Sequence, residues 1–459
     1  MSDVISDLDY QKWLLSPTAK RVLLVELQHS DGWEYVANLP FISRPTDAHP
    51  NRPYRDLIAD VANISQRIDA QLSMGDITLV NDGSIDSWAA KCWRGWQVIF
   101  KFGDASWPLD DFRILAKQIN AGLLSVSSSE IRLGIYDATA TLDQPIAREK
   151  IADDQLAPLV LGRALGVTPV RLNSTDLSYC VSHLPVQNLI VRDGNGPVLS
   201  LASTDHTAGK FTLNSYTPRE LWCEVECAYS TPLAIVQWVA QQYGFTVKTG
   251  LQLPNYSLGL HYADEVTGRQ ILDDVCAAIG GFWLINLLGE LDVQVLAEAS
   301  TTADIELHAD DIEFGRINLI RTEEPVKKIT LNYAQNHRPL TEVAGSVEDA
   351  SAVVAERLRT AWYTKDGENN TAKYPLADTV EIETVLREPQ DAQTELNRRL
   401  NLRSQRREVW ELGVFMQPDT DLIGKTVLVN HPKLQHQTGR IISQSLEPAR
   451  DSATLEVWY

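Results

Sequence analysis

The sequence predicts an α+β fold that is mainly β, with several β-barrel or β-sandwich modules that carry α/β insertions. Short runs rich in branched and aromatic residues, bounded by turn residues, recur along the chain. Few segments combine helical spacing of apolar residues with capping residues. The length of 459 residues exceeds one ordinary core, since a domain has roughly 100–200 residues. Four domains are predicted, with the bounds 1–145, 146–228, 229–300 and 301–459.

The first domain is predicted to be β-rich and barrel-like, with one helix. Strands are expected at 21–29, 75–80 and 96–102, because these segments are short, apolar and flanked by turn residues. The sequence NDGS at 81–84 is typical of a turn between apolar segments.

The helix of this domain is expected in and after "FKFGDASWPLDDF", residues 100–112. Ser106 can cap a helix that has Pro108 in its first turn. Phe112, Leu115 and Ile119 then follow at helical spacing, and Gly122 lies where a C-cap belongs.

The same stretch holds three aspartates, Asp104, Asp110 and Asp111. The preferred interpretation is structural: Asp104 ends the strand, and the other two lie where a helix dipole favours negative charge. A cation or sugar site is the alternative.

The second domain, 146–228, is also predicted to be β-rich, with strands within 158–172, 178–201 and 209–216 and a hairpin turn at 192–197. The third, 229–300, is predicted to be an α/β insertion. Its segment 230–245 is a well-capped helix, with an apolar stripe expected at Leu233, Val236, Val239 and Tyr243.

A second helix of the insertion is expected at 266–282, with Thr267 and Gln270 in capping-box spacing. A hairpin that turns at Gly289 follows it. The last domain, 301–459, is predicted to be a β-barrel with two helices, at 346–362 and 388–403. Its barrel strands are expected at 408–415, 425–430, 439–447 and 453–458.

Catalytic patterns are incomplete in this sequence. Adjacent residues on a helix point about 100° apart, so Asp273-Asp274 makes a poor glycosidase pair and is expected to be solvated. Two further acidic pairs occur, Asp153-Asp154 and Asp310-Asp311.

Asp205-His206 has no G-x-S-x-G motif with it. The nine histidines form no H-E-x-x-H, and a metal at His431 and His436 is not expected. We therefore predict no enzyme activity, no catalytic, cofactor-binding or metal-binding residues, and no cofactor.

Charge, cysteines and aromatic residues restrict the class further. The net charge of −20 argues against a duplex-binding surface, which needs clustered Lys and Arg. The basic cluster is expected to be a solvated face or to form salt bridges between subunits; it contains Arg398, Arg399, Arg403, Arg406 and Arg407.

Five cysteines are expected to be buried free thiols from a reducing compartment. The chain has twelve tryptophans, several of them near turns (Trp33, Trp88, Trp93, Trp96 and Trp107), which favours assembly surfaces. Neither a signal peptide nor a membrane span is expected.

Several stretches together resemble the tail-tip or baseplate hub proteins of long-tailed, siphovirus-like bacteriophages. They include "ANLPFISRP", "GDITLVNDGSIDSW", "PLVLGRALGVTPVRL", "VTGRQILDDVCAAIGGFWLINLLGELDVQVL" and "GRIISQSLE". The resemblance implies β-barrel modules arranged as a ring at the distal end of the tail, through which DNA passes at ejection. No cysteine follows Cys276, so the iron–sulfur centre of some relatives is not expected, nor is a fused peptidoglycan hydrolase.

The resemblance also implies partners and a place. The partners are the tail tube or distal tail protein, the tape-measure protein, and a tip or central fibre protein. DNA would pass without specific binding, because an acidic lumen repels phosphate. The location is the tail tip of the virion, after folding and assembly in the host cytoplasm. If two β-units of each chain face the tube, three copies present six modules, so a homotrimer is predicted, with a homohexamer as the alternative.

Two other functions stay open at this point. One is the adjacent distal tail ring protein, because it also uses β-barrel modules. The other is a carbohydrate-active or receptor-binding tail protein that uses tryptophans and acids as a sugar site.

Overall fold

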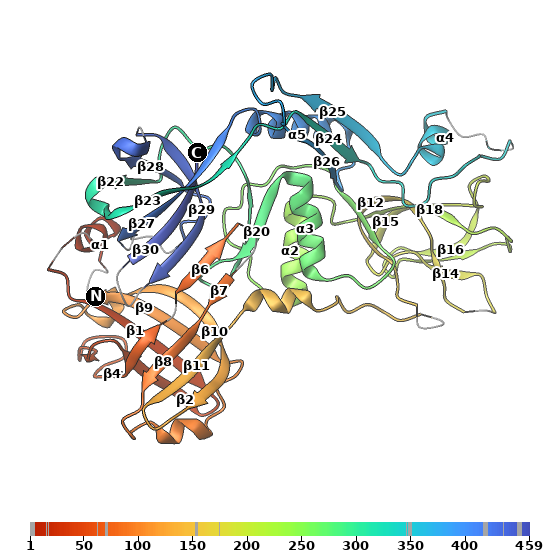
Figure 1. Ribbon diagram of the computed structural model, residues 1–459. Helices are drawn as coiled ribbons and strands as arrows, with labels where there is room; N and C mark the ends of the chain where they lie inside the picture. The colour runs from red at the N-terminus through yellow and green to blue at the C-terminus, as the bar shows by residue number, and fades with distance from the viewer. Residues whose placement is uncertain are drawn as a thin grey trace.

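The mainly β class is confirmed in the computed structural model (Figure 1), which has six sheets among the described residues. The structure describes residues 5–14, 16, 18–61, 63–68, 72–151, 155–173, 175–345, 347, 351–415, 421–434, 436–447 and 452–459. In Figure 1 an N-terminal sheet lies below a C-terminal sheet, two helices occupy the centre, and a further β-unit lies at the opposite end. Among the described helices, none is long and apolar enough to cross a membrane.

The N-terminal region forms a curved sheet of nine strands, in the order β3-β4-β2-β1-β9-β10-β11-β8-β5. Its strands are β1 (Arg21–His29), β2 (Gly32–Ala37), β3 (Phe41–Ile42), β4 (Pro53–Asp56), β5 (Ile58–Val61), β8 (Asp76–Val80), β9 (Gln97–Asp104), β10 (Arg113–Val126) and β11 (Glu130–Tyr136). Helix α1 (Asp7–Leu14) precedes β1. The strands expected at 21–29, 75–80 and 96–102 are confirmed.

The helix expected after Pro108 is wrong. A short 3-10 turn at Leu109–Asp111 leads directly into β10, which pairs with β9 and β11. A register shift between Ile114 and Ala116 leaves both Leu115 and Ala116 buried. This bulge breaks the two-residue alternation of the strand, so the apolar spacing imitates that of a helix.

The second region contains two four-stranded sheets, with the orders β15-β18-β12-β19 and β13-β14-β17-β16. The strands are β12 (Leu159–Val167), β13 (Val170–Arg171), β14 (Ser178–Cys180), β15 (Val186–Arg192), β16 (Leu201–Asp205), β17 (Lys210–Leu213), β18 (Trp222–Cys227) and β19 (Gly259–Tyr262). The turn expected at 192–197 is confirmed: a bridge joins Arg192 to Val198, and Gly196 N donates to Asp193 O.

The centre contains helices α2 (Pro232–Tyr243) and α3 (Gly268–Ile279), with the hairpin of β20 (Gly281–Ile285) and β21 (Leu291–Val295) beside them. Thr231 caps α2, and Thr267 caps α3 as predicted. The stripe expected on α2 is wrong at Leu233, which is exposed, because Ile235 and Trp238 are buried in its place.

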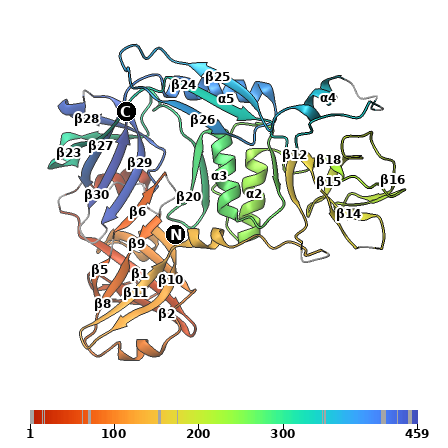
Figure 2. The same ribbon diagram turned by 45° about the vertical axis from the view of Figure 1, so that its right-hand side comes forward.

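A three-stranded sheet, β25-β24-β26, covers the central helices together with helix α5 (Pro389–Leu402) (Figure 2). Its strands are β24 (Lys328–Tyr333), β25 (Tyr363–Glu368) and β26 (Thr379–Glu383). The helix expected at 388–403 is confirmed. The one expected at 346–362 is shorter in the described part, where α4 spans Ser351–Leu358.

The C-terminal sheet has the order β22-β28-β29-β30-β27-β23, and the hairpin of β6 and β7 joins it at β29. Its strands are β6 (Ile64–Arg67), β7 (Leu72–Met74), β22 (Ile305–His308), β23 (Ile312–Glu323), β27 (Arg407–Phe415), β28 (Thr426–Asn430), β29 (Thr438–Glu447) and β30 (Ser452–Trp458). The four strands predicted at the end of the chain are confirmed. The domain bounds at 145, 228 and 300 stay predictions.

Candidate functional site

The N-terminal and C-terminal sheets share one hydrophobic core. A single cluster contains Leu23, Val25 and Phe100 of the first sheet and Val427, Ile441 and Val457 of the second. The strand β6 reinforces this union, because it belongs to the first region in sequence but pairs with Ser443–Leu446 of β29. In Figures 1 and 2, β6 lies where the two sheets meet. The two β-units are therefore held together as one body.

Two buried glutamines fix this junction. Gln444 Nε2 donates to Gln66 Oε1 at 2.7 Å, and Gln66 Nε2 donates to Ile285 O at 2.9 Å. Gln444 Oε1 accepts from Leu422 N at 3.0 Å. Since buried polar groups are costly unless bonded, these contacts favour one arrangement of the N-terminal hairpin, the C-terminal sheet and β20.

The C-terminal sheet leaves an apolar strand open at its edge. β23 pairs with β27 on one side, and among the described residues no strand pairs with its other side. Its side chains Phe314, Leu319 and Ile320 are all exposed, Phe314 completely; we call these three the β23 face. An exposed edge strand with apolar side chains is a template for pairing with another chain.

The first sheet also exposes apolar residues along one long strand. On β10, four apolar side chains are exposed, with Leu124 at 54% of its surface; they are Ile114, Ile119, Leu124 and Val126. Each β-unit therefore carries one long strand with an exposed apolar set. We take the β23 face and this set on β10 as the candidate functional site, an assembly surface.

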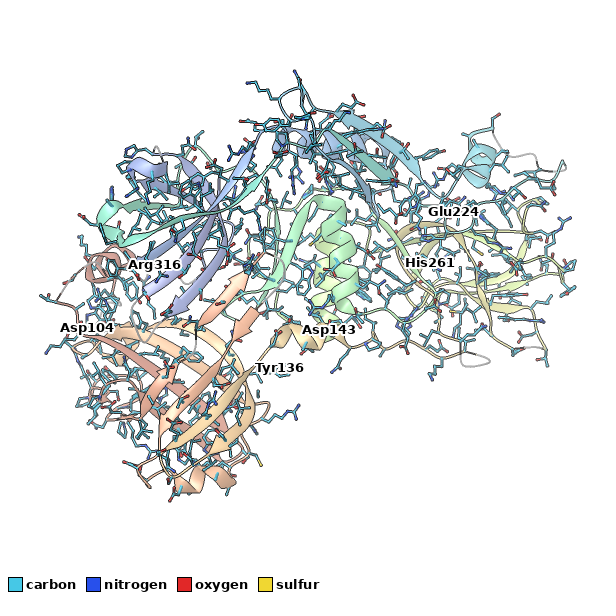
Figure 3. All side chains as sticks on the ribbon, viewed as in Figure 1. Asp104, Tyr136, Asp143, Glu224, His261 and Arg316 are labelled. Atoms are coloured by element: carbon cyan, nitrogen blue, oxygen red, sulfur yellow. The ribbon has the colours of Figure 1, made fainter. Side chains whose placement is uncertain are left out.

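The aspartates of residues 100–112 have structural roles, as preferred from the sequence, although not as helix caps. Asp104 accepts hydrogen bonds from Trp13 Nε1 at 2.7 Å, Lys20 N at 2.8 Å and Ser106 N at 2.9 Å. Burial alone would raise its pKa, but these bonds outweigh it and hold the pKa of Asp104 below its usual value. Asp104, which is labelled in Figure 3, thus fastens Trp13 of α1 and Lys20 to the end of β9.

The remaining acidic candidates do not form a site. The expectation that Asp273-Asp274 is a solvated pair is wrong for Asp274. Asp274 is partly buried and accepts a hydrogen bond from Tyr262 Oη at 2.5 Å. Asp273 accepts a hydrogen bond from Trp283 Nε1 at 2.7 Å. Asp311 caps His308. Asp153-Asp154 lies outside the described residues. Among those described, no group of three or more His, Cys, Asp or Glu side chains could hold a metal ion.

Two of the histidines form a buried pair. The rings of His261 and His337 lie edge to face, 4.9 Å between centroids, beside a cavity of about 150 Å³. Burial lowers the pKa of His261 to about 4 and that of His337 to about 3. Asp205 accepts from Thr207 N, and His206 Nδ1 contacts Val186 O at 2.9 Å, so these two residues serve a turn.

The basic cluster corrects the sequence interpretation. Arg398 and Arg399 are only partly exposed, at 28% and 11% of their side-chain surface, and both bind the fully buried Glu395 at 2.6 Å. Helix α5 ends at Leu402, so the other arginines do not continue its face. They form ion pairs within the chain, Arg403 with Glu323, Arg406 with Glu408 and Arg407 with Glu298. The sequence could not show this, because three of the four acids are distant in sequence or buried.

Tryptophans and cysteines mostly belong to the interior. Trp88 and Trp93 are buried in the first core, which makes the assembly-surface interpretation wrong for these two, whereas Trp96 is exposed. Cys180, Cys223, Cys227 and Cys276 are buried free thiols, as predicted, and Cys92 is exposed. Burial raises the pKa of Cys180 and of Cys227 to about 11.

Comparisons with known proteins found similar structures but no similar sequence families. No family model matches the chain, and no curated protein matches it. A 43 kDa tail protein of prophage MuSo2 from Shewanella oneidensis is 11% identical over 95% of this chain and 98% of its own, with a TM-score of 0.45. A tail protein from Neisseria meningitidis MC58 is 10% identical over 96% and 97%, with a TM-score of 0.45. A prophage tail protein from Listeria monocytogenes EGD-e is 8% identical over 95% and 94%, with a TM-score of 0.42. No assignment follows from TM-scores below 0.5.

Proposed function

We propose that this chain is a structural protein of a bacteriophage tail, a hub ring at the distal end that joins the tail tube to the tip. The observation that carries the proposal is the union of the two β-units in one core, with an exposed apolar strand on each. A ring needs two different surfaces on each subunit, since a closed ring is built from heterologous contacts. The resemblance noted in the sequence supports the same role.

The ring is proposed to be a homotrimer, in which the two β-units of three copies make six modules around the channel. The junction at Gln66 and Gln444 would keep the two units of each copy at a constant spacing. The formal charge of −20 supports a channel that repels DNA and does not bind it. The proposed neighbours are the tail tube or distal tail protein, the tape-measure protein and a tip fibre.

A reconstruction of the virion tail tip tests the role, and native mass spectrometry tests the copy number. We expect density for this chain in a ring at the distal end, with three copies. Immuno-gold labelling that marks only the head, or no virion, would contradict the role. Six copies in the ring would contradict the trimer but not the role in the tail. Release of muropeptides by the purified protein would support a carbohydrate-active protein in place of the ring.

A further inference from the structure

A cavity of about 410 Å³ lies where three parts of the fold meet. Its walls come from the end of α3 with the start of β20, from the sheet of β24 and β26, and from the last turn of α5. In Figures 1 and 2, β20 lies between the C-terminal sheet and α3. Apart from two glycines and three arginines, the lining side chains are apolar. Cavities of this size and character are typical of sites for small organic ligands.

The apolar wall belongs to three separate hydrophobic clusters. Phe282 packs in the core shared by the two β-units, Ile329 in the core of the central helices, and Leu402 in a small cluster on the C-terminal sheet. Four more apolar side chains of the lining are only half-buried: Ile68, Leu296, Val380 and Ile382. In proteins, an apolar cavity of about 150 Å³ accepts benzene. The larger volume here therefore suits an apolar chain of roughly ten carbon atoms.

The arginines give the cavity an excess of positive charge. Arg398 and Arg399 share a single acid, Glu395. Arg403 lies 3.8 Å from Glu323, which also binds a further arginine outside the cavity at 3.1 Å. Each glutamate is thus divided between two guanidinium groups, so an anion at the cavity would be favoured.

Two of the three guanidinium groups can donate hydrogen bonds to a ligand. Arg399 donates within the protein through Nε and Nη2, but its Nη1 has no hydrogen-bond partner among the described residues and is not enclosed by protein atoms. The side chain of Arg403 is 44% exposed and donates no hydrogen bond to the described residues. Arg398 is less available, because it already donates to Glu395 and to the last carbonyl groups of α3.

The backbone along the cavity is already hydrogen-bonded. Val326 N donates to Arg403 O at 3.0 Å, and Val326 O accepts from Asn369 Nδ2 at 3.0 Å. Leu296 N donates to Gly280 O at 3.1 Å. A bound peptide would therefore bury amide groups without partners, which is unfavourable. A hydrocarbon chain has no such groups.

An adjoining hollow indicates the direction of the ligand. It has a volume of about 340 Å³ and shares Gly281, Phe282 and Arg399 with the cavity. Asp273 lines this hollow, where it accepts from Trp283 Nε1 at 2.7 Å. A negative head group would be repelled by Asp273, so it would lie on the side of Arg403.

We propose that this cavity binds a free medium-chain fatty acid, with the carboxylate at Arg399 and Arg403 and the chain against the apolar wall. Charge-assisted hydrogen bonds hold the head group, and each buried methylene adds affinity. The bound chain would contact all three hydrophobic clusters and fix the sheet of β24 and β26 against β20. The site is complete within one chain and is independent of the proposed role in the tail.

Isothermal titration calorimetry of the full chain with decanoate, below the concentration at which it forms micelles, tests the proposal. Octanoate, which is two methylenes shorter, should bind about 15-fold more weakly, at about fourfold per methylene. Decyltrimethylammonium has the same chain with a positive head group and should show no saturable binding. Equal binding of the two decyl compounds, or no binding of decanoate, would overturn the proposal.

Two variants locate the ligand. Arg403→Met should weaken decanoate binding about tenfold or more, because it removes a charged hydrogen-bond donor. Val380→Phe should abolish binding by filling the cavity. The matched control is Arg406→Met, because Arg406 is 49% exposed, pairs with Glu408 and does not line the cavity. Equal affinities of Arg403→Met and Arg406→Met would also overturn the proposal.

A second measurement covers a variant that does not fold. Crystals of the unmodified protein soaked in 10-bromodecanoate should show an anomalous bromine peak beside Phe282 or Ile329, with carboxylate density at Arg403. A bromine peak that lies only outside the cavity would contradict the proposed site.

Discussion

Gln444 donates a hydrogen bond of 2.7 Å to Gln66, although the two residues are 378 positions apart in the chain. Both side chains are almost fully buried, at 0% and 1% exposure. Each amide also bonds a backbone group, Leu422 N for one and Ile285 O for the other. The pair therefore couples the first strands of the chain to the last ones and to the central hairpin.

We expect Gln66→Ala and Gln444→Ala each to lower the free energy of unfolding by about 1–3 kcal/mol, because each leaves buried polar groups unpaired. The double variant should lose less than the sum of the two, since the groups form one network. Urea unfolding of the four proteins measures this coupling. Losses that simply add would show that the two residues act independently.

The β23 face should control assembly and leave folding unchanged. We expect Phe314→Ser to weaken self-association, because the side chain is completely exposed in the single chain and would be covered in the ring. Stability should stay within about 0.5 kcal/mol, as for most surface changes. Sedimentation velocity gives the assembly state, and thermal unfolding gives the stability.

Leu376→Ser is the matched control, since Leu376 is 87% exposed but lies in the turn before β26, outside the C-terminal sheet. It should assemble like the unmodified protein. If Phe314→Ser also assembles normally, the β23 face is not part of the subunit contact.

Local sequence patterns predicted most helices and strands of this fold, but they did not predict the pairing between distant segments. Capping residues correctly marked α2 and α3, because a cap involves only neighbours in sequence. The bulge at Ile114 and Ala116 depends on β9 as partner, so spacing alone suggested a helix. The pairing of β6 with β29 left no signal in either segment. For the same reason the sequence did not indicate the junction of Gln66 and Gln444, because its surroundings come from distant segments.

The buried histidine pair should make the protein sensitive to mild acid. The pKa of His261 is lowered to about 4, so the folded chain disfavours the proton that the unfolded chain takes up near pH 6.5. The contribution of neutral His261 to the free energy of unfolding should therefore be fully present above pH 6.5 and be lost as the pH decreases toward 4. Over this interval His261 accounts for up to about 3 kcal/mol, at 1.36 kcal/mol per pKa unit.

His261→Gln should flatten this part of the pH profile of unfolding, and the exposed His308→Gln should not alter it. Urea midpoints at half-unit steps between pH 7 and 4 provide the comparison. Identical slopes for His261→Gln and the unmodified protein would mean that His261 does not cause the acid sensitivity.

Two glycines with the same left-handed backbone should respond differently to alanine. Gly162, within β12, has φ +68°, and a Cβ there would lie 2.0 Å from the carbonyl oxygen of Leu258. Gly244 ends α2 with φ +74° and has nothing within 4 Å of such an atom. Gly244→Ala should therefore cost only the backbone strain, about 1–2 kcal/mol. Gly162→Ala must also push β12 away from the backbone before β19, and we expect more than about 4 kcal/mol or failure to fold. Guanidinium unfolding of both variants tests this. Equal losses of unfolding free energy would show that β12 and the segment at Leu258 can separate without penalty. The close packing of these two segments would then not be the reason for glycine at position 162.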